Sequence, residues 1–242
     1  MAKLALLLEL TRHQKKQKAG IKQNSPRDSG GYTLLELLIA ILIAGSIAAI
    51  AAPGWSSFTN QRRVGKANDV IFNALQEAQS EAKKRKTSYS VSFRTPSGKA
   101  PEFAIYPTQI QNADGSVRAV DPTNPSDLKP SAWRNFGQDL SIKPGQVLLG
   151  TNLNGENSGA NGSPTYPPPT SSPLPKITFD YMGTLPNANF PKDNLNNNKA
   201  LIVEVGAPVG NSNQIVASTR RCVKVQTLLG SMQTGRGKEC DS

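Results

Sequence analysis

Histidine is almost missing from this chain of 242 residues, since the single one, His13, lies in the first segment. Everything after Gly31 therefore lacks the base of a Ser-His-Asp or Cys-His arrangement and the commonest ligand of zinc and iron sites. Cysteine is scarce too, because Cys222 and Cys240 are the only two. Two cysteines are too few for a structural zinc site. We therefore expect no enzyme activity, no cofactor and no metal.

Apolar residues are also few, at 37%, whereas glycine (20) and proline (18) are plentiful. This composition predicts one modest core, long loops and a good deal of β-structure. The net charge of +11 is unevenly placed, because residues 1–31 carry seven basic residues against two acidic ones. The smaller positive charge of the remaining residues usually indicates only a solvated surface, and sometimes a surface that binds nucleic acid.

One apolar run, from Leu34 to Ala52, stands out against this background and is interrupted only by Glu36, Gly45 and Ser46. Its 19 residues would span about 29 Å as a helix, close to the thickness of a bilayer's hydrocarbon. The basic segment ahead of it predicts a cytoplasmic N-terminus and an exported remainder. A secretory signal peptide or a plain signal anchor would also have such a run. The apolar region of a signal peptide would be shorter, and this run continues toward a second helical segment. A plain signal anchor gives no reason for Glu36, because an acid in lipid normally has a partner.

The stretch Gly31-Tyr32-Thr33-Leu34-Leu35-Glu36 resembles the type IV prepilin motif. In that family a prepilin peptidase cuts after the glycine, and the acid becomes the fifth residue of the mature chain. The resemblance implies cleavage between Gly31 and Tyr32 and methylation of the new N-terminus, although Tyr32 stands where phenylalanine is usual. It also implies an assembly role for Glu36, which would pair with the N-terminal amine of a neighbouring subunit in lipid, where little water competes.

A single long helix is predicted after the leader, residues 1–31. Residues 32–53 form its transmembrane or filament-core half, and residues 54–86 form its amphipathic half. Pro53 and Gly54 predict a kink between the halves, because proline lacks a backbone N–H and glycine is flexible.

The amphipathic half carries one apolar stripe, which is typical of a helix packed on a sheet. The basic run Lys83 to Lys86 at its end has two explanations, a nucleic-acid patch or favourable charges at a helix C-terminus, and the second is simpler. The stripe consists of Val64, Ala67, Ile71, Ala74, Leu75, Ala78 and Ala82.

Residues 87–242 show the alternation of short strands, which together with the helix predicts an α+β fold with an antiparallel, β-rich head. Two segments, 107–130 and 151–175, are rich in Asn, Gly, Ser and Pro and are predicted to be surface loops outside the core, which connect strands more often than they bind ligands. The expected strands are at 89–93, 103–105, 147–149, 177–179, 201–205, around 215, and from 222.

The C-terminal segment holds both cysteines, separated by about 17 residues. In an exported head a disulfide between Cys222 and Cys240 is expected, worth roughly 3 kcal/mol, with two free thiols as the alternative. Between them, Gly230 and Gly235 have the spacing of a phosphate loop. Arg236 follows without a Lys-Ser/Thr pair, so any assembly ATPase must be a separate partner.

The stretch "ITFDYMGTL", from Ile177 to Leu185, followed by strands and the ending "TGRGKEC", is similar to the GspH/FimT family of minor pilins and pseudopilins. That family places a β-rich head behind a prepilin helix. FimT-like members are associated with DNA uptake through a basic C-terminal tail, whose cations would contact phosphates without reading bases. The matching candidates here are Arg236 and Lys238, with Arg220, Arg221 and Lys224 nearby.

Three functions follow from these resemblances: a minor structural subunit of a type IV pilus, a DNA-binding minor pilin for natural transformation, and a pseudopilin of a type II secretion system. The expected partners are prepilin peptidase, other pilins or pseudopilins, a separate ATPase and platform protein, and DNA in the second case. We expect a bacterial protein that crosses the inner membrane once and has its head in the periplasm. The subunit is then expected to be incorporated into a pilus or pseudopilus.

Overall fold

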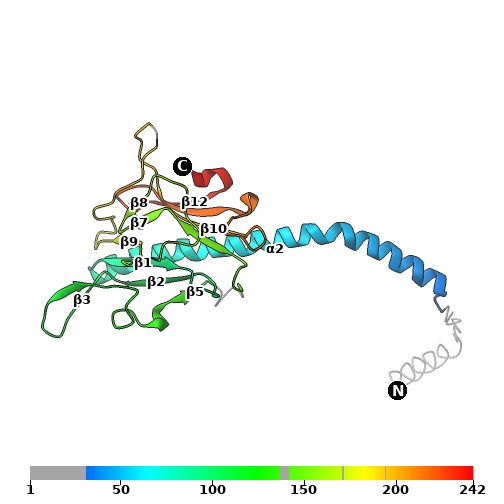
Figure 1. Ribbon diagram of the computed structural model, residues 1–242, viewed down its shortest axis with the longest axis horizontal. Helices are drawn as coiled ribbons and strands as arrows, with labels where there is room; N and C mark the ends of the chain where they lie inside the picture. The colour runs from blue at the N-terminus through cyan, green and yellow to red at the C-terminus, as the bar shows by residue number, and fades with distance from the viewer. Residues whose placement is uncertain (1–30, 137–141, 171, 194, 242) are drawn as a thin grey trace, which may run out of the picture. The chain divides into compact units, whose positions relative to one another are not determined.

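The computed structural model describes residues 31–136, 142–170, 172–193 and 195–241, with backbone alone at 51–53 (Figure 1). The chain divides into two units, one ending at Ile50 and one beginning at Ala51, and each is described by itself. The predicted leader, apart from Gly31, lies outside the described residues.

The helix α2 runs from Leu34 to Arg85. At its start Thr33 accepts hydrogen bonds from the backbone N–H of Glu36 through its side chain (3.2 Å) and from that of Leu37 through its carbonyl (3.1 Å). At its end Lys86 adopts φ 53°, the left-handed conformation that commonly terminates helices. The long helix is thus confirmed, and the kink at Pro53 and Gly54 stays a prediction.

The second unit contains two four-stranded sheets, and every pairing between the described strands is antiparallel. In the first, the order is β5 (Arg134–Asn135), β2 (Glu102–Pro107), β1 (Tyr89–Arg94), β9 (Lys176–Phe179). In the second, it is β12 (Met232–Arg236), β11 (Arg221–Val225), β10 (Leu201–Gly206), β6 (Leu148–Thr151). Two small hairpins pair β3 (Gln109–Gln111) with β4 (Val117–Ala119) and β7 (Leu153–Gly155) with β8 (Ser158–Gly159). Three 3-10 turns are η1 (Pro130–Ala132), η2 (Ala217–Thr219) and η3 (Gly237–Asp241).

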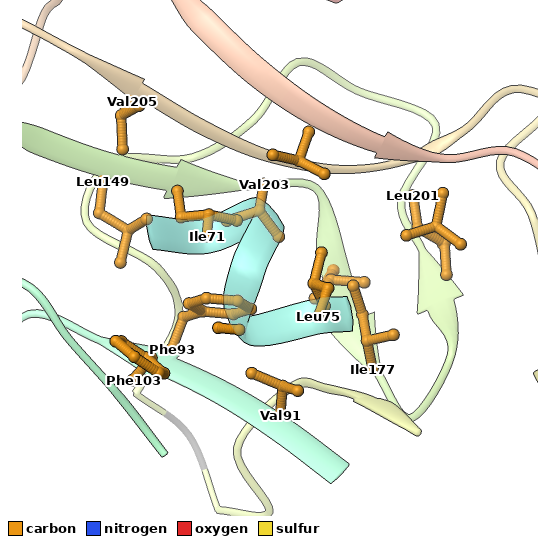
Figure 2. Packing of buried hydrophobic residues seen from close by; sticks show 14 of the residues in the cluster. Ile71, Leu75, Val91, Phe93, Phe103, Leu149, Ile177, Leu201, Val203 and Val205 are labelled. Atoms are coloured by element: carbon orange, nitrogen blue, oxygen red, sulfur yellow. The ribbon is translucent and has the colours of Figure 1, made fainter. Parts of the chain in front are cut away.

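The core lies between the two sheets, around the second half of α2. Figure 2 shows Ile71 and Leu75 of α2 with Val203 and Val205 of β10 on one side and Phe93 of β1 on the other. Every residue of the predicted stripe is at most 1% exposed. Four of the seven are alanines, whose small side chains let the sheets approach the helix closely. The α+β fold with an antiparallel head is therefore confirmed, with two sheets against the helix.

The strand predicted around Ile215 is wrong, and several strands that were not predicted are present, the longest of which is β12. Ile215 forms only an isolated bridge with Pro208, and its side chain packs on Gly206, so close that a Cβ there would lie 2.8 Å from it. The chain then turns into η2, where Thr219 accepts a hydrogen bond from the N–H of Ala207. β12 escaped prediction because its exposed, polar residues have no apolar alternation.

Both segments predicted as surface loops outside the core are only partly so. Segment 107–130 contains the hairpin β3–β4 and the buried Val120 and Leu128, and segment 151–175 also contributes to the interior. Asn157 is fully buried, and its side-chain amide donates to the carbonyls of Thr178 (3.0 Å) and Pro186 (2.9 Å) and accepts from the Thr178 N–H (2.7 Å). Leu153 and Leu174 are buried as well. The composition concealed this, since a buried asparagine with all its bonds satisfied looks in sequence like a loop residue.

The stretch "DYMGT" after β9, the edge strand of the first sheet, forms a tight turn that is hydrogen-bonded to α2. The Asp180 carboxylate accepts hydrogen bonds from the N–H groups of Met182 (2.9 Å) and Thr184 (2.8 Å) and from the Thr184 hydroxyl (2.7 Å). Gly183 adopts φ 83°, which suits glycine, and its carbonyl accepts from Gln79 of α2 (2.8 Å). Burial alone would raise the pKa of Asp180, but these hydrogen bonds outweigh it and hold the pKa below its usual value.

We predict that Asp180→Asn lowers the free energy of unfolding by about 1.5 kcal/mol near neutral pH, because hydrogen bonds to a charged acceptor are lost. Since the folded pKa is depressed, this contribution exists above the unfolded pKa and disappears as pH falls through the folded pKa. Thermal unfolding of both chains across acidic pH should show the difference vanish in acid. Met182→Ala, an exposed residue of the same turn, should behave as wild type; a pH-independent difference for Asp180→Asn would contradict the assignment.

Candidate functional site

The residues of the prepilin-like motif surround the first turn of α2. Gly31 and Tyr32 precede the helix, and Thr33 caps it by accepting the Glu36 N–H. Thr33-x-x-Glu36 has the spacing of a capping box, and an acid in the first turn is favoured by the helix dipole. The expected cleavage point therefore lies one residue ahead of the cap, with only Tyr32 between them. Sequence reasoning missed this cap, although the Thr-x-x-Glu pattern would have indicated it.

The helical residues that follow the motif are exposed along their whole length up to Ile50. Their large apolar side chains are 51–84% exposed. The hydroxyl of Ser46 donates to the Leu42 carbonyl (2.8 Å), so this polar group is satisfied within the helix. A helix that is apolar on every side is stable only in lipid or among other apolar helices. The exposed set is Leu34, Leu35, Leu37, Leu38, Ile39, Ile41, Leu42, Ile43, Ile47 and Ile50.

Within the described residues, no single helix satisfies the length and hydropathy requirements of a membrane span. The segments Leu34–Ile50 and Gly54–Arg85 satisfy them only when taken together, by length and composition.

The C-terminal region is built around a buried ion pair that the sequence did not reveal. Glu204 of β10 is 1% exposed and accepts two hydrogen bonds from Arg220, at 2.7 Å from Nε and 2.8 Å from Nη2. The hydroxyl of Tyr166 also donates to Glu204, and Arg220 contacts Asp241 of η3. Burial raises the pKa of Glu204, against the opposing effect of the Arg220 guanidinium. The available sequence signal was an acid inside the apolar strand "LIVEV".

The predicted disulfide is formed and fixes the end of the described chain to the second sheet. Cys222 of β11 and Cys240 of η3 are joined with a Cα–Cα distance of 5.8 Å. Two further bonds hold the same turn, since the Lys224 ammonium donates to the Glu239 carbonyl (2.9 Å) and the Arg236 N–H donates to the Glu239 carboxylate (2.9 Å). The C-terminal segment up to Asp241 is therefore part of the fold.

The five cations predicted to contact DNA are not equivalent in the structure. Arg220 is engaged by Glu204 and Asp241, and Lys224 is buried with its ammonium on a backbone carbonyl. Arg221 and Arg236 lie directly opposite each other on β11 and β12. Burial lowers the pKa of Arg221, and the charge of Arg236 lowers it further. Arg236 and Lys238 are exposed. The structure thus leaves Arg221, Arg236 and Lys238 as candidates.

No group of three or more His, Cys, Asp or Glu among the described residues is arranged to hold a metal ion.

Residues 26–52 match the family described as the prokaryotic N-terminal methylation motif. This segment contains the expected cleavage point, Glu36 and the whole apolar run. The chain therefore carries a type IV prepilin motif and is pilin-like, and such a motif is typical of membrane-anchored pilins.

Among solved structures, the chain is similar to the type IV minor pilin FimU of Pseudomonas aeruginosa strain PAO1. The identity is 15%, the alignment covers 75% of this chain and 94% of that one, and the TM-score is 0.39. No curated protein sequence matches the chain significantly.

We predict that Arg220→Ala destabilises the head by roughly 3–5 kcal/mol, because it leaves the Glu204 carboxylate buried without its partner. Denaturant unfolding of the full chain in detergent measures this loss. The double change Glu204→Leu with Arg220→Leu removes both charges and should recover most of the stability. If Arg220→Ala unfolds at the wild-type denaturant concentration, the ion pair does not support the C-terminal segment.

Proposed function

We propose that this chain is a minor pilin-like structural subunit of a type IV pilus. In this proposal prepilin peptidase cuts between Gly31 and Tyr32, and the mature subunit remains in the inner membrane with its head in the periplasm until assembly. Its N-terminal helix then packs against those of other pilins in the filament. A separate ATPase and platform protein drive this assembly. The observation that carries the proposal is the methylation motif at residues 26–52, whose apolar helical residues are exposed on all sides up to Ile50.

Glu36 is the assembly residue in this proposal. It lies in the first turn of α2, four residues after Tyr32, where cleavage would create an amine. Among exposed apolar neighbours an unpaired carboxylate is costly, and the amine of an adjacent subunit would neutralise it. Thr33 satisfies the Glu36 backbone N–H, which leaves the carboxylate itself for a partner in trans.

Cleavage is tested by mass spectrometry of the chain from cells that contain a prepilin peptidase. We predict a mature N-terminus at Tyr32, carrying one methyl group, and an uncut chain when the peptidase is deleted. A chain that still begins at Met1, or one cut near Ala52 as a secretory signal would be, contradicts the proposal.

The assembly role is tested with Glu36→Val. We predict that this variant is cut normally but is at least tenfold depleted from sheared pili, because the neighbouring amine loses its partner. The matched control is Ser46→Val, which removes a polar group from the same helix whose bond is internal. Normal incorporation of Glu36→Val would show that the assembly role is wrong, whereas recovery of wild type in sheared pili supports a pilus over a type II secretion pseudopilus.

A second candidate is a DNA receptor for natural transformation, and the like-charged pair Arg221 and Arg236 favours it. Like charges directly opposite on neighbouring strands are destabilising, so such a pair suits an anionic ligand. Arg236 is exposed on the edge strand β12, Lys238 is exposed on η3, and the half-buried Arg221 lies opposite Arg236 on β11.

We predict that, if the chain is a receptor, the full chain in detergent binds duplex DNA with an affinity that falls as salt rises, because cations released from phosphates drive binding. Arg236→Glu with Lys238→Glu should abolish the shift in a gel-retardation assay. Lys99→Glu with Lys129→Glu changes the net charge equally at exposed sites elsewhere and should retain binding. Absence of binding by wild type at low salt would leave the structural role alone.

A further inference from the structure

Just beyond the apolar run, one face of α2 presents two aromatic and then two basic residues. Trp55, Phe58, Arg62 and Lys66 follow one another at steps of three and four, which places them along a single helical face. All four are exposed, Trp55 by 72% and Phe58 by 48%. Large aromatic side chains on a helix surface are costly in water, so this face is suited to a less aqueous environment.

The side chains of this face contact one another. The rings of Trp55 and Phe58 lie 6.2 Å apart between centroids. The guanidinium of Arg62 lies over the Phe58 ring, 4.6 Å from its centroid. Helical side chains lean toward the N-terminus, and this cation–π contact holds the Arg62 charge close to the aromatic pair.

A groove of about 320 Å³ runs between this face and β11 and is lined by Phe58, Gln61, Arg62, Gly65, Lys66, Asp69 and Arg221. Arg221 lies against the helix at Gly65, where a Cβ would be 3.7 Å from the Arg221 Nε, an ordinary contact distance. Three cations line the groove with one carboxylate, Asp69. The pKa of Arg221 is lowered first by its burial and then by Arg236, whereas Asp69 in the groove acts in the opposite direction. The groove is therefore suited to an anion.

The order of residues along the chain fits the headgroup layer of a bilayer. Trp55 follows Ala52, the last residue of the apolar run, by three positions and Phe58 by six, so the aromatic pair comes directly after the run that is suited to lipid. The headgroup layer lies directly outside the hydrocarbon and is roughly 5–8 Å thick on each side. Aromatic residues concentrate in that layer, and nearby Lys and Arg are attracted to anionic lipids.

We infer that Trp55, Phe58, Arg62, Lys66 and Arg221 form an aromatic-basic collar that binds the phosphate headgroups of anionic phospholipids before the subunit enters a filament. The inference rests on the membrane residence in the proposed function. The exposed aromatic pair favours lipid over duplex DNA, because contacts to phosphate alone need no apolar surface. In the subunit that has not yet been assembled, the collar selects anionic lipids as neighbours and holds the head close to the membrane.

The test uses the full chain with Trp133→Phe, which leaves Trp55 as the only tryptophan of the two. This chain is reconstituted in phosphatidylcholine vesicles that contain equal small fractions of either brominated phosphatidylglycerol or brominated phosphatidylcholine. Bromine quenches tryptophan only at close range, so the quenching of Trp55 reports which lipid gathers at the collar. We expect several-fold stronger quenching by the brominated phosphatidylglycerol.

Arg62→Gln with Lys66→Gln should remove most of this preference, since each basic residue near an anionic surface strengthens association about fivefold. Lys99→Gln with Lys129→Gln is the matched control and should keep the preference. Thermal unfolding of each variant checks that these exposed changes leave the fold intact.

Three results would overturn the inference. Equal quenching of wild type by the two lipids shows no anionic selectivity, and a preference that survives Arg62→Gln with Lys66→Gln shows that the collar is not its cause. If Arg62→Gln with Lys66→Gln no longer retards DNA in a gel without vesicles, while its lipid preference is unchanged, the groove binds nucleic acid and not lipid.

Flotation with vesicles separates this inference from the proposed function. A chain that does not float contradicts membrane residence, whereas a chain that floats but is quenched equally by both lipids contradicts only the collar.

Discussion

The burial of one stripe of α2 between two antiparallel sheets is the constraint on which the rest of the head depends. Val64, Ile71 and Leu75 are fully buried, and strands of both sheets contact them. Burying this apolar surface supplies the main driving force for a chain with few apolar residues. It also fixes the opposite face of the helix in place, and that face carries the collar. The same helix thereby organises the core and displays functional residues.

Electrostatics in the head divides into charges that hold the structure and charges that remain for partners. Glu204 and Arg220 satisfy each other in the interior, and the Lys224 ammonium is bonded to the C-terminal turn. Arg221 and Arg236 have no comparable hydrogen-bonded carboxylate among the described contacts. Arg221 lies in the groove beside the helix, and Arg236 lies opposite it on the edge strand β12. This division explains why a basic segment need not be a uniform binding surface. Only the cations that folding does not use are placed to meet an anion.

Two successive regions of α2 are suited to different environments although both are helical. Near its start, exposed apolar residues require lipid or other helices, and Glu36 is the exception that needs a partner. Near Trp55 the surface becomes aromatic and then basic, as expected for a boundary between lipid and water. In the proposed function these regions act in succession. The collar binds lipid headgroups while the subunit is in the membrane, and the Glu36 carboxylate pairs with a neighbouring amine when the subunit joins a filament.

The sequence by itself determined the features that depend on local periodicity or on neighbours in the chain. The long helix, its buried stripe, the prepilin motif and most central strands were predictable, because burial repeats every 3.6 residues in a helix and every two in a strand. Only the tertiary structure decided which cations are free, that Asn157 is buried, that Ile215 is not in a strand and that β12 is. These outcomes depend on contacts between residues far apart in the chain, such as Glu204 with Tyr166 or Arg221 with Gly65. A charge or an amide has the same identity in the sequence whether it is exposed or paired in the interior, and only folding brings its partner to it.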